Sequence, residues 1–101
     1  MSYTSAEAER LLGVKSHVLR YWVEEVPLIQ PRKDASGRRV FSGRDLRLLL
    51  RLKHLLHERR FTVEGARAQL ERELTGEWQD LRAELDGLRS QLMELYFLLE
   101  S

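Results

Sequence analysis

The chain has 101 residues, of which 43% are hydrophobic and 33% are charged, and its formal net charge is +1. This composition is ordinary for a folded domain and excludes wholesale disorder and collagen-like structure. The absence of cysteine excludes a disulfide scaffold and a thiolate zinc site. No apolar run approaches the roughly 20 residues that span a bilayer, and the N-terminus lacks the pattern of a secretion signal, so we expect a cytoplasmic protein.

The small net charge hides a division between two parts of the chain. Residues 1–60 contain 13 lysine and arginine residues against 7 aspartate and glutamate residues, whereas residues 61–101 contain 4 against 9. A basic first part suits a phosphate backbone, and an acidic second part would be repelled by one. A solvated surface of mixed charge explains the same counts, so charge alone does not decide between these interpretations.

Five sites where a helix can begin are marked by a capping hydroxyl or a glycine: Thr4, Ser16, Ser42, Thr62 and Thr75-Gly76. Thr4 and Ser42 are each followed three residues later by a carboxylate, which completes a capping box. The second helix is expected to run from Ser16 to about Val26, where Pro27 stops it. Leucine-rich periodicity predicts a central core helix over 43–60 and a shorter helix over 63–74.

The first two predicted helices are short, and Gly13-Val14 joins them tightly. The second helix places its apolar residues on one inner face: Leu19, Trp22, Val23 and Val26. A polar outer face is left: Lys15, Ser16, His17, Arg20 and Tyr21. Cations, a hydroxyl, an imidazole and a phenol gathered within two turns suit contacts with the grooves and phosphates of a nucleic acid.

A basic loop that begins at Pro31 and contains Gly37 is the one clear break in the helical pattern. The pairs Leu28-Ile29 before the loop and Val40-Phe41 after it can form two very short strands. The loop contains four cationic residues: Arg32, Lys33, Arg38 and Arg39. A solvated turn explains them too, but we favour contact with DNA because the loop follows two helices of helix-turn-helix length.

The last segment carries a strict heptad seam, whose members alternate at spacings of three and four: Trp78, Leu81, Leu85, Leu88, Leu92, Leu95 and Leu99. A helix with so narrow an apolar stripe cannot bury it alone. It packs either on its own domain or on a second copy, and the regular spacing favours a coiled-coil homodimer. We therefore divide the chain into a head over 1–75 and a dimerisation helix over 76–101.

Several motifs, in this order and at this spacing, resemble the MerR family of bacterial transcription regulators over about residues 3–72. They are Tyr3-Thr4, Leu11-Leu12-Gly13-Val14, Leu19-Arg20-Tyr21-Trp22, Pro31-Arg32, Gly37-Arg38-Arg39-Val40-Phe41, Asp45-Leu46 and Phe61-Thr62-Val63-Glu64-Gly65-Ala66. The Leu-Arg-Tyr-aromatic block and the Gly-Arg-Arg-x-aromatic block are the most specific of them.

The resemblance implies a mainly α fold, with a winged helix-turn-helix head followed by a C-terminal coiled-coil helix. It implies a sequence-specific, nucleoid-associated regulator that binds double-stranded DNA as a homodimer, with antiparallel dimerisation helices and possible contact with RNA polymerase or another protein. The recognition helix would enter the major groove, and the wing would hold flanking backbone. Together with the face analysis, it selects these DNA-binding residues: Thr4, Lys15, Ser16, His17, Arg20, Tyr21, Arg32, Lys33, Arg38, Arg39 and Phe41.

The sequence offers less support for other functions. No catalytic constellation is present, so we expect no enzyme and no cofactor. His54 and His57 are three residues apart, but no further ligand is placed near them, and no metal site is expected. Many members of the MerR family carry an effector module, and this sequence shows none. The alternative that stays open is a coiled-coil adaptor, or a phage or architectural DNA protein without sequence-specific regulation.

Overall fold

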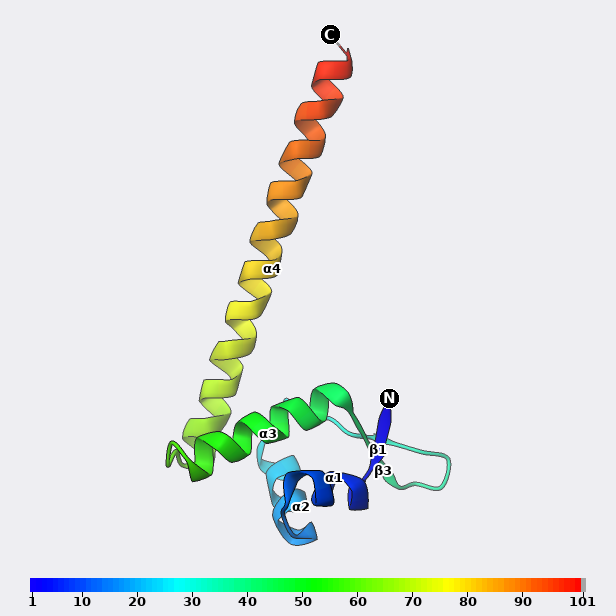
Figure 1. Ribbon diagram of the computed structural model, residues 1–101, viewed down its shortest axis with the longest axis vertical. Coiled ribbons are helices and arrows are strands. Elements are labelled where there is room, and N and C mark those ends of the chain that lie inside the picture. Colours follow the sequence, from blue (N-terminus) through cyan, green and yellow to red (C-terminus); the bar gives the residue numbers. More distant parts are fainter. Residues whose placement is uncertain (101) are drawn as a thin grey trace. The chain divides into compact units, whose positions relative to one another are not determined.

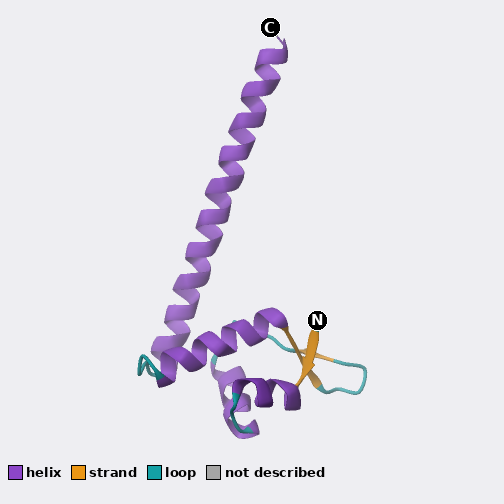
Figure 2. Ribbon diagram, viewed as in Figure 1, coloured by secondary structure: helices purple, strands orange, loops and turns teal. Residues whose placement is uncertain are grey.

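The computed structural model describes residues 1–100 (Figures 1 and 2). In chain order the elements are β1 (Ser2–Thr4), α1 (Ser5–Leu12), α2 (Ser16–Glu25), β2 (Arg32–Lys33), β3 (Arg39–Ser42), α3 (Gly43–His57) and α4 (Val63–Glu100). The chain divides into two compact units, Met1–Glu71 and a unit that starts at Arg72. The fold is mainly helical with one small sheet, as the sequence predicts.

The helix-turn-helix begins with the predicted capping box. The hydroxyl of Thr4 accepts a hydrogen bond from the backbone N–H of Glu7 at 3.2 Å, and the Glu7 carboxylate accepts one from the Thr4 N–H at 3.1 Å. These bonds favour the charged carboxylate and hold the pKa of Glu7 below its ordinary value. Helix α1 ends at Leu12, and the capping residue Gly13 has a φ of 68°, the left-handed conformation expected of a glycine at this turn.

The start of α2 differs from the prediction. Lys15, rather than Ser16, occupies the cap position, and no side chain caps the helix. The Lys15 carbonyl accepts hydrogen bonds from the N–H groups of Val18 and Leu19, both at 3.1 Å, so Ser16 is already the first helical residue. The helix ends at Glu25, and Val26 is extended with a φ of −119°.

The sheet has the strand order β1-β3-β2, and both pairings are antiparallel. The predicted strand at Val40-Phe41 is confirmed, but the one at Leu28-Ile29 is wrong. Ile29 instead donates to the carbonyl of Val26 at 3.1 Å in the turn that follows α2, and it is buried. The strand that pairs with β3 on the wing side is β2, and β1 is a third strand that the sequence does not predict.

Helix α3 is the central core helix, as predicted, and its buried face consists of Leu46, Leu49, Leu52 and Leu55. It begins at the predicted Ser42 capping box. Asp45, which is 6% exposed, accepts from the Ser42 N–H at 2.9 Å and from the Gln30 N–H at 3.4 Å. This carboxylate therefore ties the segment that leads into the wing to the start of the core helix. The helix ends at His57, three residues earlier than predicted.

Helix α4 runs without interruption from Val63 to Glu100, so the predicted break at Thr75-Gly76 is wrong. One glycine inside a helix costs about 1 kcal/mol relative to alanine, which strong helix formers on both sides can offset. Ala66 and Leu70 lie in the core of the first unit. No helix within residues 1–100 is long and apolar enough to cross a membrane.

Candidate nucleic-acid interface

Helix α2 has the two faces that its sequence predicts. Leu19 and Trp22 are each 3% exposed and belong to the core. The predicted polar residues of the opposite face are all exposed: Lys15, Ser16, His17, Arg20 and Tyr21. The division into faces is therefore confirmed, whereas contact between the outer face and DNA stays a prediction.

A surface groove of about 210 Å³ forms where α1, α2 and β3 meet. Its lining consists of Ser5, Glu9, Ser16, Leu19, Arg20, Arg39 and Phe41. The groove brings Arg20 of the second helix together with Arg39 of the wing strand, although 19 positions separate them in sequence. Ser5 and Glu9 were not predicted from the sequence as residues of this site. The only sequence signal for them is their i,i+4 spacing, which places both on one face of α1.

The wing tip is an ordered turn built around Asp34. One oxygen of its carboxylate accepts from the backbone N–H of Ser36 at 2.9 Å and from that of Arg38 at 3.0 Å. The backbones of Asp34 and Arg38 also pair at 2.9 Å. Gly37 has a φ of 81°, which an L side chain rarely adopts. The turn thus presents the exposed side chains of Lys33 and Arg38 on a fixed backbone.

Two of the predicted DNA contacts have other roles in the structure. Phe41 is 1% exposed and packs in the core, where it pairs across the sheet with Tyr3. Phe41 therefore anchors the wing strand, and its side chain exposes almost no surface in the groove that it helps to line. The Thr4 side chain is exposed, and its hydroxyl oxygen accepts in the capping box of α1, so the O–H can still donate and contact with DNA stays a prediction.

A second groove, of about 410 Å³, lies beside the last turn of α2 and is lined by Tyr21, Glu25, Val63, Glu64 and Arg67. Arg67 pairs with Glu71 at 3.1 Å. The carboxylates of Glu25 and Glu64 place negative charge next to Tyr21, at the end of the cationic face.

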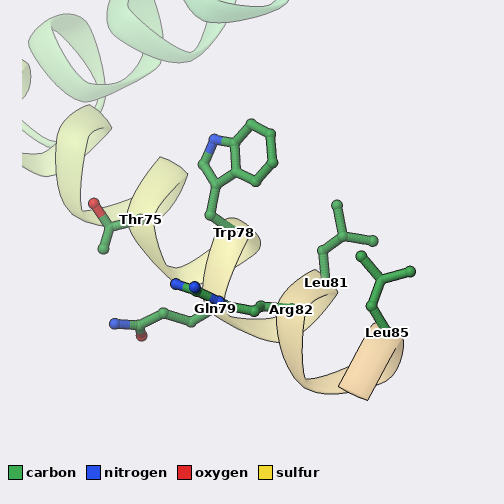
Figure 3. Close-up of a pocket in the computed structure, with 6 residues that line it drawn as sticks. All are labelled: Thr75, Trp78, Gln79, Leu81, Arg82 and Leu85. Carbon is green, nitrogen blue, oxygen red and sulfur yellow. The ribbon is translucent and has the colours of Figure 1, made fainter. Parts of the chain in front are cut away.

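The predicted seam of α4 is fully open to solvent. All seven members, Trp78, Leu81, Leu85, Leu88, Leu92, Leu95 and Leu99, are between 46% and 79% exposed. A hollow of about 580 Å³ is lined by residues of this helix alone, and Figure 3 shows Trp78, Leu81 and Leu85 projecting on the same side of it. The hollow is therefore an uncovered helix face. Close to the end of the helix Met93, Tyr96, Phe97 and Leu98 are exposed as well.

Within residues 1–100, no group of three or more His, Cys, Asp or Glu side chains is arranged to hold a metal ion. The two histidines of α3 are both exposed. His57 lies against the indole of Trp22, with ring centroids 6.2 Å apart. This contact gives His57 a packing role.

Comparison with known proteins agrees with this architecture. The family model described as MerR HTH family regulatory protein matches residues 3–73. No curated protein matches the chain. Among solved structures, HiNmlR, a MerR family regulator that lacks the sensor domain and was crystallised bound to promoter DNA, aligns with 99% of this chain and 80% of its own, with a TM-score of 0.64 and 24% identity.

A transcriptional regulator of the MerR family from Bacillus cereus aligns with 91% of this chain and 75% of its own, with a TM-score of 0.60 and 17% identity. At these identities the two structures show a shared fold. The family model covers most of the chain, including both helices of the helix-turn-helix and the wing. The chain therefore belongs to the MerR helix-turn-helix family, and its family and fold are those of a DNA-binding regulator of transcription.

Proposed function

We propose that this protein is a homodimeric regulator that binds a specific double-stranded DNA sequence, with α2 in the major groove and the wing on the flanking backbone. The observation that carries the proposal is the groove between α1, α2 and β3, in which Arg20 and Arg39 lie together. One cation from a helix that fits the major groove and one from the wing can thus reach adjacent parts of the same duplex.

The distribution of charge supports the same face. The exposed residues of α2, of its cap position and of the wing include five cations: Lys15, Arg20, Arg32, Lys33 and Arg38. Positive side chains that neutralise phosphates release condensed counterions, which gives affinity with a strong dependence on salt. The Asp34 turn fixes the backbone from which Arg38 projects, so we assign Arg38 and its neighbours to backbone contact and Arg20 to base readout.

The open seam of α4 supports dimerisation. Seven apolar residues at heptad spacing stay exposed in the single chain, and a second copy offers a seam of the same width and spacing. We propose that two copies pair through this seam. The antiparallel orientation follows from the resemblance to the MerR family, and it would place two heads on one duplex.

The DNA-binding proposal is tested by selecting binding sites from genomic fragments and measuring affinity for the selected site and for competitor DNA at several salt concentrations. We expect a clear preference for the selected site, together with a log–log salt slope of about −0.9 for each phosphate neutralised. Equal affinity for every sequence at physiological salt contradicts the regulator and favours the architectural alternative.

The dimer is tested by light scattering on Leu88→Asp, with Ser90→Asp as the matched control. Leu88 is in the seam and Ser90 is outside it, so the same charge is added to two exposed positions of one helix. We expect Leu88→Asp to be monomeric and to bind DNA weakly, and Ser90→Asp to behave like the wild type. A monomeric wild type contradicts the dimer. A Leu88→Asp variant that loses a partner protein but keeps full DNA affinity favours the adaptor alternative.

The orientation of the pair is tested by oxidation of a Leu99→Cys variant, because the chain contains no other cysteine. In a parallel pair the two introduced thiols lie side by side and form a disulfide. In an antiparallel pair they lie tens of ångströms apart at about 1.5 Å per residue. We expect no cross-linked dimer, and efficient cross-linking contradicts the antiparallel arrangement.

A further inference from the structure

A side chain of the core helix reaches across to the turn of the helix-turn-helix. The ammonium group of Lys53, on α3, donates a hydrogen bond to the backbone carbonyl of Leu12 at 2.6 Å. The two residues are 41 positions apart in sequence, and the bond is partly buried. Leu12 is the last residue of α1, so this bond joins the core helix to the point where the two DNA-reading helices are connected.

The Leu12 carbonyl is an acceptor that helix geometry leaves available. The last carbonyls of a helix lack intrahelical partners and form the negative end of its dipole. The N–H groups of Gly13 and Val14 both donate to the carbonyl of Glu9, at 2.8 and 3.1 Å. Both N–H groups thus close the end of α1 on Glu9, and the Lys53 ammonium satisfies the Leu12 carbonyl and complements the negative end of the dipole.

The turn itself has little freedom around this bond. Gly13 adopts a left-handed φ of 68°, and a Cβ atom at this position would stand 3.6 Å from the Lys53 ammonium. The ammonium group thus lies directly over the turn. Only three residues, Gly13 to Lys15, separate the end of α1 from the start of α2. A bond that holds the end of α1 therefore also restricts where α2 begins and in which direction it runs.

We infer that Lys53 is a positioning residue for DNA recognition: it sets the orientation of the recognition helix without touching DNA. This inference rests on the proposed function of α2 as the DNA-reading element. Lys53 is half-buried on α3 and bonds toward α1, whereas the proposed DNA-contacting side chains project from the outer face of α2 and from the wing. Its effect on binding should therefore act through the geometry of base contacts and not through phosphate charge.

Lys33 offers a matched control, since it is an exposed lysine of the wing strand β2. Both lysines are replaced by methionine, which keeps an unbranched chain and removes the charge. Affinities for the selected site and for competitor DNA are then measured over a range of salt concentrations, with each variant shown to be folded by circular dichroism. Lys53→Arg tests whether another cation restores the bond.

For Lys53→Met we expect the ratio of specific to competitor affinity to fall roughly tenfold, a typical contribution of one good base contact. The salt slope should stay at the wild-type value, and Lys53→Arg should recover part of the ratio. For Lys33→Met we expect the opposite pattern, with equal losses on both DNAs and a shallower slope. Equal losses and a shallower slope for Lys53→Met would make Lys53 a phosphate ligand and overturn the inference, as would an unchanged ratio.

Hydrogen exchange gives a readout that needs no DNA. In Lys53→Met, the amides of Val18 and Leu19, which bond to Lys15 at the start of α2, should exchange faster than in the wild type. The amides of α3 around Leu49 should be unaffected. Unchanged exchange at the start of α2 overturns the positioning role even if the wild type proves to have no sequence preference, so failure of this inference and failure of the proposed function are distinguishable.

Discussion

The imidazole of His57 meets the indole of Trp22 edge to face, with ring centroids 6.2 Å apart and ring planes at 65°. Trp22 lies on the buried face of α2, and His57 is in the last turn of α3. The contact therefore joins the C-terminal end of the core helix to the inner face of the recognition helix. The Lys53 hydrogen bond joins α3 to the end of α1, so the core helix contacts both helices of the helix-turn-helix through separate side chains.

His57→Ala is expected to lower the free energy of unfolding by about 0.5–1.5 kcal/mol. This is the usual contribution of an aromatic pair in addition to the burial of its apolar surface. His54→Ala is the control, because it makes the same replacement on an exposed part of α3, where no ring contact involves His54 among the described residues. Urea unfolding at fixed protein concentration, followed by tryptophan fluorescence, measures both. Equal stabilities of the two variants would show that the ring contact contributes nothing.

Arg60→Gly is expected to stabilise the protein by roughly 0.5–1 kcal/mol. Arg60 has a φ of 56° in the connection between α3 and α4, and a non-glycine residue pays about 1–2 kcal/mol for the left-handed conformation. Greater freedom of glycine in the unfolded chain offsets part of this gain. Glu58→Gly, where φ is −91°, should destabilise instead. Thermal unfolding of the two variants checks the opposite signs, and a less stable Arg60→Gly refutes the prediction.

Ser42→Ala is expected to cost about 1–2 kcal/mol, since the hydroxyl of Ser42 accepts from the Asp45 N–H at 3.0 Å and caps α3. Ser16→Ala should change stability by less than about 0.5 kcal/mol, because Ser16 is inside α2 and caps nothing. Chemical denaturation of both variants compares the two serines. A large loss for Ser16→Ala would restore Ser16 as the cap of α2.

Arg20→Ala and Arg38→Ala are expected to weaken DNA binding in different ways. Arg38 projects from the wing, so its loss should reduce affinity for every sequence alike and make the log–log salt slope about 0.9 shallower. Arg20 lies on the outer face of α2, so its loss should also reduce the preference for the selected site, by roughly ten- to hundredfold. Titrations with specific and competitor DNA measure both effects. Wild-type behaviour of both variants would remove this face from the proposed interface.

Features that depend on neighbouring residues could be predicted from the sequence. The capping boxes at Thr4 and Ser42 involve partners three residues away, and the two faces of α2 follow from helical spacing alone. The wing loop was visible because Pro31 and Gly37 interrupt the periodic pattern. Because helical spacing alone places them on one side of α2, the predicted residues of its outer face are all exposed.

Features that depend on distant residues could not be predicted in this way. Strand β1 exists because Ser2 pairs with Ser42, and nothing in a three-residue polar segment marks it as a strand. The continuity of α4 through Gly76 depends on the helix as a whole, which outweighs one poor helix former. Phe41 matched a wing motif, but its burial is decided by packing against the core.

The Asp34 turn affects how tightly this protein can bind a partner. Because the carboxylate of Asp34 already holds the backbone of Ser36 and Arg38, part of the conformational entropy of the loop is lost during folding and not on binding. Less ordering of the loop is then needed on association, so a larger share of the interaction energy is retained as affinity. Asp34→Ala would move that ordering cost from the folding step to the encounter itself.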